Sequence, residues 1–151
     1  MKVYGRIPWL LLACIAMLFD GLSDSVANEH TSNLKSYVFI NRILLVPSKS
    51  TNLSKITDTY THNQSDLIER KLLVFSISKD KVTPVFAPNG EKLILNVREL
   101  NKLSKGNSVH LIGLDGGLKA QYATFDFDAV LSDIDRMPMR RRELNHRATQ
   151  N

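Results

Sequence analysis

Short continuous apolar runs alternate with amphipathic segments along this chain. The runs at residues 42–46, 71–78 and 108–114 have the length expected of strands that are buried on both faces. Pro47 closes the first of them, because proline cannot continue the hydrogen-bonded ladder of a central strand. We therefore expect these runs to form the centre of a sheet, the first two as adjacent parallel strands.

Segments with apolar residues at helical spacing connect the runs. Residues 48–64 place Leu53, Ile56 and Tyr60 on one helical face, although three threonines in the segment lower its helix propensity. Residues 127–134 repeat the pattern, and the acidic residues near the start of that segment favour a helix N-terminus. We expect both segments to be helices that pack on the sheet.

Residues 82–106 are predicted to add a hairpin and a further helix. Two apolar runs flank the Asn89-Gly90 step, which favours a hairpin, and Pro84 would keep its strand at a sheet edge. Asn96 can cap the helix that follows, with Glu99 at the third position and Gly106 as the stop. The residues expected to face inward on this helix are Val97, Leu100 and Leu103.

The order of these elements defines the expected fold class. After the third central strand, Asp115-Gly116-Gly117 is predicted to be a tight hairpin turn into a strand at 118–123, and the last helix follows. A right-handed βαβ unit followed by an antiparallel hairpin and a helix is the thioredoxin order. We expect a single α/β domain with a thioredoxin-like mixed sheet of about four core strands, flanked by helices on both faces.

The first 27 residues predict an export signal. Lys2 and Arg6 precede an apolar run at 7–19, which is shorter than the ~20 residues that span a bilayer, and small residues end at Ala27. We expect cleavage near Ala27 and a secreted or periplasmic protein that is not an integral membrane protein. Lipidation at Cys14 and an uncleaved anchor are the alternatives. The other expected boundaries are a disordered leader at 28–35, the domain at 36–146 and a tail at 147–151.

Cysteine usage limits the chemistry. The only cysteine, Cys14, lies in the predicted signal, so the expected mature chain has no thiol for disulfide exchange or peroxide reduction. The net charge of +5 favours acidic partners, although such a charge commonly serves solubility alone.

Four blocks of sequence carry a resemblance to a known family. They are residues 41–46, 69–75, 111–119 and 134–143, and the last reads IDRMPMRRRE. Over about residues 34–146 the chain resembles the domain of unknown function family 4174. That family is thioredoxin-like and occurs in small exported bacterial proteins and in some extracellular-matrix proteins of animals.

The resemblance implies a thioredoxin-like or peroxiredoxin-like scaffold without its redox groups. Residues 47–51 (PSKST) stand where a redox member carries its cysteine, and Asn107-Ser108 stands where thioredoxins place a cis-proline. Residues 38–40 (VFI) depart from the family pattern, which often has an aromatic residue and a lysine before Asn41. A fold of this kind does not by itself specify a function.

The basic cluster Arg140, Arg141 and Arg142 is the sharpest chemical feature. Guanidinium groups suit carboxylates and phosphates, so the cluster could be an anionic site near the end of the last helix. It could equally complement that helix's negative end, or pair with Asp133 or Glu143. The other candidate binding residues are Lys119, Met137 and Met139, and methionines serve both as core filler and as adaptable binding surface.

Other chemistries are less well supported. The four histidines lack ligand spacing, so no metal and no cofactor is expected. Nucleic-acid binding is not expected, because residues 140–147 lack interleaved aromatics. We therefore expect a binding or accessory module for an anionic protein, glycan or envelope surface, with no catalytic residue. The alternative is a cysteine-independent enzyme that uses the vacated site at Ser48 to Thr51, although no activating group adjoins these hydroxyls in sequence.

Overall fold

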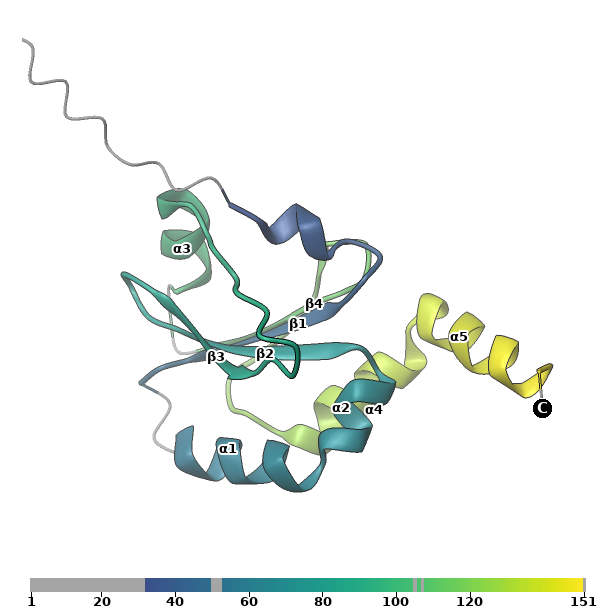
Figure 1. Cartoon of the computed structure of the whole chain (residues 1–151). Helices are drawn as coiled ribbons and strands as arrows, with labels where there is room; N and C mark the ends of the chain where they lie inside the picture. The colour runs from purple at the N-terminus through teal and green to yellow at the C-terminus, as the bar shows by residue number, and fades with distance from the viewer. Residues whose placement is uncertain (1–31, 50–52, 105, 107, 151) are drawn as a thin grey trace, which may run out of the picture.

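A mixed five-stranded sheet forms the centre of the protein (Figure 1). The computed structural model describes residues 32–49, 53–104, 106 and 108–150. The strands are β1 (Arg42–Pro47), β2 (Leu72–Ile77), β3 (Val82–Phe86), β4 (Val109–Ile112) and β5 (Leu118–Tyr122), in the spatial order β3-β2-β1-β4-β5. β1 and β2 are parallel neighbours, which confirms the prediction, and every other pairing in the sheet is antiparallel.

Helices cover both faces of the sheet, so the predicted α/β class and thioredoxin-like arrangement are confirmed (Figure 1). One face carries α1 (Leu53–His62), α2 (Gln64–Glu69) and α4 (Phe127–Arg136). The other carries the 3-10 turn η2 (Leu34–Tyr37) and α3 (Val97–Leu103). A last helix, α5 (Pro138–Ala148), projects from the end of the sheet at which β1 and β2 begin.

Alternation along β1 divides the core into two layers. Leu44 and Val46 pack in the layer under α1, α2 and α4, whereas Ile43 and Leu45 pack in the layer under α3. All six residues of β1 are buried, and so are all six of β2. This double burial explains the continuous apolar runs of the sequence.

The predicted N-cap of α3 and the predicted turn are present, but α3 ends at Leu103 with Ser104 as its C-cap, before the predicted stop at Gly106. The Asn96 side chain accepts a hydrogen bond from the Glu99 backbone N–H, and the Gly113 N–H donates to the carbonyl of Gly117. Leu100 is buried as predicted, but Val97 is 62% exposed, so the prediction that it faces inward is wrong. Val97 is the first residue of α3 and lies about 60° around the helix axis from the buried Leu100, at the edge of the buried face.

The predicted hairpin around Asn89-Gly90 is wrong. β3 pairs with β2 instead, and residues 91–96 form no strand. The backbone of that segment is satisfied elsewhere, because the Asn33 side chain donates to the Lys92 carbonyl and accepts from the Ile94 N–H. Pro84 does lie in an edge strand, as predicted.

The structure at both ends of the domain also differs from the prediction. The predicted leader reached residue 35, yet Leu34 begins η2 and packs against the α3 layer. The predicted last helix is followed by a second one, because Met137 adopts an extended conformation and Pro138 starts α5. The residue before a proline is sterically biased away from helical backbone, and proline is favoured at the first helical position.

Two glycines with nearly the same positive φ provide a matched test of the tight turn. Gly116 has φ +77°, and a Cβ there would lie 2.9 Å from Val38 Cγ2; Gly90 has φ +74° and nothing within 4 Å. We expect Gly90→Ala to cost about 1 kcal/mol of backbone strain. Gly116→Ala should cost about 1–3 kcal/mol more, because the methyl group overpacks against Val38. Urea unfolding of both variants checks this, and equal losses would contradict the contact with Val38.

Candidate functional site

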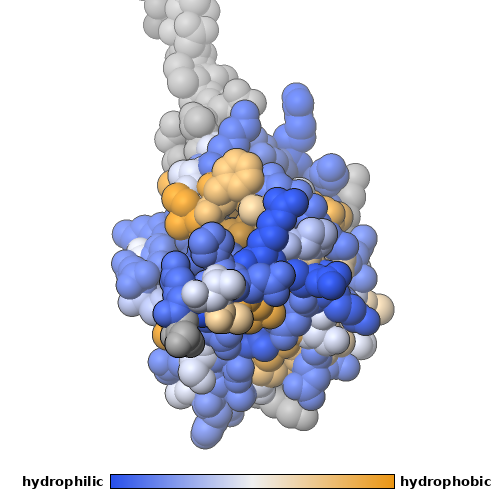
Figure 2. All heavy atoms as spheres, turned by 90° about the vertical axis from the view of Figure 1, so that its right-hand side faces the viewer, coloured by the Kyte–Doolittle hydropathy of each residue, from blue (hydrophilic) through white to orange (hydrophobic). Residues whose placement is uncertain are grey.

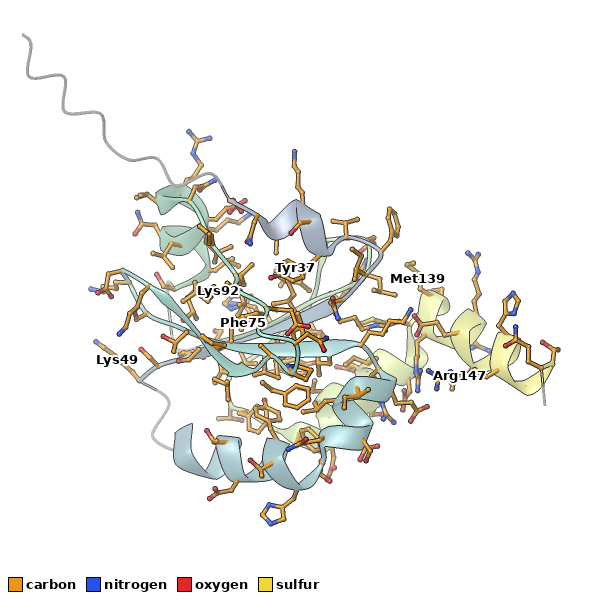
Figure 3. The ribbon with its side chains drawn as sticks, viewed as in Figure 1. Tyr37, Lys49, Phe75, Lys92, Met139 and Arg147 are labelled. Carbon is orange, nitrogen blue, oxygen red and sulfur yellow. The ribbon has the colours of Figure 1, made fainter. Side chains whose placement is uncertain are left out.

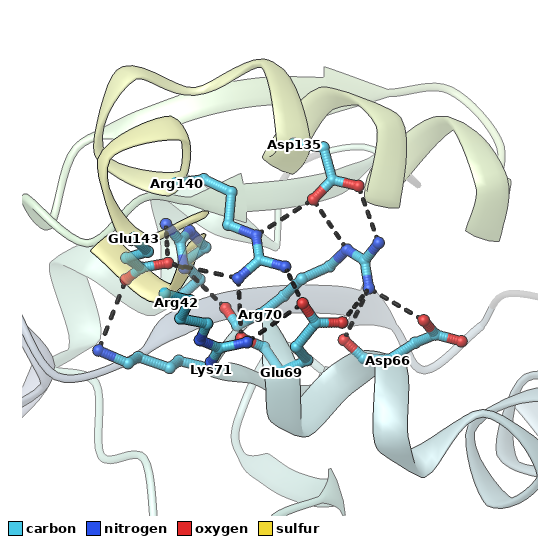
Figure 4. A network of polar contacts seen from close by, with 9 residues as sticks. Arg42, Asp66, Glu69, Arg70, Lys71, Asp135, Arg140 and Glu143 are labelled. Atoms are coloured by element: carbon cyan, nitrogen blue, oxygen red, sulfur yellow. Dashed lines mark hydrogen bonds and ion pairs between the residues drawn. The ribbon is translucent and has the colours of Figure 1, made fainter. Parts of the chain in front are cut away.

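Helix α5 is attached to the body mainly by ion pairs. Arg140 is the residue of α5 that is buried, at 1% exposed. The helix has no apolar side that could pack on the body instead. Arg140 Nη2 lies 2.6 Å from Glu69 Oε1, and its Nε lies 3.2 Å from Asp135 Oδ1 (Figure 4). Its Nη1 also donates to the Glu69 carbonyl. Arg140 therefore joins α5 to the ends of α2 and α4.

A second buried arginine extends this network to the sheet. Arg42, the first residue of β1, is fully buried, and its Nη2 lies 3.3 Å from Glu143 Oε2. Its Nη1 donates to the Arg70 carbonyl at 2.7 Å, and Lys71 Nζ lies 3.5 Å from Glu143 Oε1. Burial lowers the pKa of Arg42, and the nearby Glu143 carboxylate opposes that shift.

The network also shifts the protonation of its carboxylates. The hydrogen bond from Arg140 lowers the pKa of Glu69. Burial works to raise the pKa of Asp135, but the guanidinium groups of Arg70 and Arg140 outweigh it and the pKa is lowered.

The ion-pair network carries a net positive charge. Its cations are Arg42, Arg70, Lys71, Arg140 and Arg147, and its anions are Asp66, Glu69, Asp135 and Glu143. Five cations against four carboxylates leave one positive charge.

The three consecutive arginines do not form one exposed cluster. Successive helical residues point about 100° apart. Arg140 therefore faces the body, whereas Arg141 and Arg142 are exposed. Of the pairings considered from sequence, Arg140 does approach Glu143, at 3.7 Å, while Asp133 pairs with Arg136. Of these three arginines, only Arg141 and Arg142 are exposed and so placed to meet a partner.

The other three candidate binding residues meet in one pocket. Lys119, Met137 and Met139 line a pocket of about 250 Å³, together with Leu114, Asp115, Pro138 and the buried Arg42. Lys119 is ion-paired with Asp115, and this contact lowers the pKa of the Asp115 carboxyl. Gly113 allows the approach, because a Cβ there would lie 2.6 Å from Lys119 Cε.

A second hollow adjoins this pocket. It has a volume of about 290 Å³ and shares Lys119 and Met137 with the first, and Asp133 and Arg136 line its other side. The Tyr122 hydroxyl donates to Asp133 at 2.8 Å, which lowers the pKa of that carboxyl. Met137 and Lys119 therefore line both pockets.

A third pocket lies at the opposite end of the sheet, where β1 and β2 end. It measures about 320 Å³, and its polar lining includes Ser48, Lys49, Ser78 and Lys79. Figure 3 labels Lys49 at this end and Met139 at the other. Ser78 is held in the turn to β3, because its hydroxyl donates to Asp80. The residues of the predicted alternative site that follow Lys49, residues 50 and 51, lie outside the described residues.

Neither a metal-ligand cluster nor a membrane-spanning helix occurs in the described part of the chain. Among residues 32–49, 53–104, 106 and 108–150, no group of three or more histidine, cysteine or acidic side chains could hold a metal ion. His110 is buried in β4, and burial lowers its pKa. Over the same residues, no helix combines the length and the apolar character that crossing a membrane requires.

These features define an α/β domain of thioredoxin-like arrangement whose last helix is fastened by buried arginines. Residues 33–143 match the family described as Domain of unknown function (DUF4174), and the chain belongs to that family. The matched region contains both Arg42 and Glu143, the partners that join β1 to α5. No curated protein and no solved structure matches the chain.

Proposed function

We propose that this domain is a non-enzymatic binding module for an anionic partner. The proposal rests on one observation: Lys119, Met137 and Met139 line the same pocket. The exposed Arg141 and Arg142 follow Met139 closely in sequence. We call residues 136–142 the elbow, because they join α4 to α5. Figure 2 faces the end of the molecule from which α5 projects, and its surface is mostly hydrophilic with separate apolar patches.

The elbow combines exposed positive charges with two apolar methionine side chains. Arg136 is 72% exposed at its side chain, and Arg141 and Arg142 are exposed on α5. Guanidinium groups present paired donors to carboxylates, phosphates and sulfates. The flexible thioethers of Met137 and Met139 can adapt to an apolar part of the partner. Binding through such a surface depends on salt, because exposed charges are screened.

The proposal places this module outside the cytoplasm. The N-terminal pattern that ends at Ala27 supports export. Pro47-Ser48-Lys49 at the end of β1, in place of a cysteine, supports a redox-silent scaffold derived from thioredoxin-like proteins. The resemblance to extracellular-matrix domains of animals agrees with a partner at an envelope or matrix, such as an acidic protein or glycan.

Removal of the two exposed arginines tests the proposal. We expect an Arg141→Gln/Arg142→Gln double variant to stay folded and to bind three polyanions, heparin, poly-glutamate and phosphatidylglycerol vesicles, about 2- to 30-fold more weakly than wild type. That range follows from about 0.2–1 kcal/mol for each exposed pair. Surface plasmon resonance at low and physiological salt measures it.

A charge-matched variant controls for net charge. Arg98 and Lys102 are exposed on α3, on the other face of the sheet, so Arg98→Gln/Lys102→Gln removes the same charge from a different surface. This control should bind almost like wild type. Equal losses in the two double variants, or no binding by wild type, would rule out an elbow-specific site.

The alternative is a cysteine-independent enzyme, and one observation favours it. The pocket at the ends of β1 and β2 holds Ser48 and Ser78 together with Lys49 and Lys79, a set that could position an anionic substrate. Turnover of ester or phosphoester substrates that is lost in a Ser48→Ala or Ser50→Ala variant, and kept in the Arg141/Arg142 variant, would favour the enzyme over the binding module.

A further inference from the structure

The pocket beside the elbow has a mainly apolar wall with one deeply placed cation. Leu114, Met137, Pro138 and Met139 supply the apolar wall. Its volume of about 250 Å³ lies just below the roughly 300–1,000 Å³ of pockets that hold drug-sized ligands. It is therefore sized for one compact group, such as a single apolar side chain or a small organic acid.

Arg42, which lines this pocket, has one buried donor without a partner. Its Nη1 and Nη2 are engaged by Glu143 and the Arg70 carbonyl, but Nε has no hydrogen-bond partner within the part of the chain that the structure describes. Arg42 lines the pocket and is fully buried. A buried N–H without an acceptor is rare in folded proteins and costs about 1–3 kcal/mol. A ligand oxygen that displaced the groups now covering Nε would remove that cost.

The local charge balance selects the sign of the ligand. The ion-pair network that contains Arg42 has one more cation than it has carboxylates, whereas Lys119 at the pocket is paired with Asp115. A carboxylate would neutralise the excess, and an ammonium group would increase it. The apolar wall favours a carboxylate that is attached to an apolar group.

We infer that this pocket binds a carboxylate borne on a compact apolar group, with the acid directed to Arg42 and the apolar part against Met137 and Met139. This inference rests on the proposed function and narrows it, because it names the group of the anionic partner that enters the pocket. Two sources share the chemistry: a free small acid, and the C-terminal residue of a polypeptide with an apolar end.

Methyl NMR of the purified protein labelled at methionine tests the inference with defined probes. We expect N-acetyl-leucine and hexanoate to shift the Met137 and Met139 methyl signals in a saturable way. N-acetyl-leucinamide and hexanamide should bind at least 10-fold more weakly, because they lack the charge. The peptide Ala-Ala-Leu distinguishes the sources: binding as tight as that of N-acetyl-leucine indicates a polypeptide C-terminus, and weaker binding indicates a free acid. Equal binding of acids and amides would overturn the inference.

Variants at the pocket separate it from the basic surface. Met139→Glu places a like charge in the pocket and should abolish binding of the acids, whereas Met139→Leu keeps an apolar side chain of similar volume and should stay within about threefold. Arg42→Lys tests whether the guanidinium group is needed for acid binding. Because Arg42 also takes part in the ion-pair network, a loss in that variant could be structural. The comparison of Met139→Glu with Met139→Leu therefore decides. Unchanged binding in Met139→Glu would exclude this pocket.

The two proposals can fail independently. Arg141 and Arg142 do not line the pocket, so their double variant should bind N-acetyl-leucine like wild type while it loses polyanions. Loss of polyanion binding without any acid binding would leave the proposed function standing and reject the pocket ligand. Acid binding without polyanion binding would support the pocket ligand and reject the proposed binding of polyanions at the elbow.

Discussion

Replacement of Arg140 by alanine is expected to lower the free energy of unfolding by about 3 kcal/mol, near the lower end for breaking a buried ion pair. The loss is large because Arg140 is buried and contacts Glu69, Asp135 and the Glu69 carbonyl at once. It stays near the lower end because Glu69 and Asp135 retain contact with water, so they are not left as fully buried charges. Removal of the side chain also leaves a cavity beneath α5.

The neighbouring arginine is the control. Arg141→Ala removes the same kind of side chain from the same helix, but from an exposed position, and should change the free energy of unfolding by no more than about 0.5 kcal/mol. Guanidinium chloride would screen these charges, so urea unfolding followed by circular dichroism is the suitable measurement. Similar losses in both variants would mean that the network does not hold α5 in place.

The sheet could be predicted because its signal is local. Residues 43–46 and 72–75 are apolar without a break, and strands buried on both faces favour that pattern. The cap at Asn96 was equally local, since a capping side chain and its backbone donor lie three residues apart. Each of these features depends on neighbours in sequence.

Helix α5 was missed because its stabilisation is not local. It has no apolar face, and the groups that hold it come from Glu69, Asp135 and Arg42. Arg42 and Glu143 are 101 positions apart, and no periodicity within either segment predicts that they pair. The error at Asn89-Gly90 has the same origin, because the distant Asn33 supplies the hydrogen bonds that a hairpin partner would have supplied.

The candidate site was predicted in pieces. Lys119, Met137 and Met139 were each chosen for their own chemistry, and the fold brings them to one pocket. Arg42 was overlooked, although a charged residue at the start of an otherwise apolar run is a signal that could have been read from the sequence. Lys, Glu, Arg and Asp are almost never fully buried unless they are paired, so such an arginine indicates a partner elsewhere in the fold.

Acidification is expected to destabilise the domain in two pH ranges. Burial lowers the pKa of His110 below its ordinary value of 6.5, so the unfolded chain takes up that proton first. Stability should therefore begin to fall as the pH drops below about 6.5. The second range belongs to Glu69, Asp115, Asp133 and Asp135, whose pKa values are lowered from 4.5 for the glutamate and 3.8 for the aspartates.

The sign of the second range follows from linkage. A carboxylate with a lowered pKa in the folded state stabilises the fold at any pH above its unfolded value, and that contribution is lost as the pH falls through the lower, folded value. The thermal midpoint should therefore fall steeply below about pH 4.5. An Arg140→Met variant should show a shallower fall there, since Glu69 and Asp135 lose a partner, whereas Arg141→Met should follow wild type. Parallel curves for all three proteins between pH 5 and pH 2.5 would show that the network carboxylates do not control acid stability.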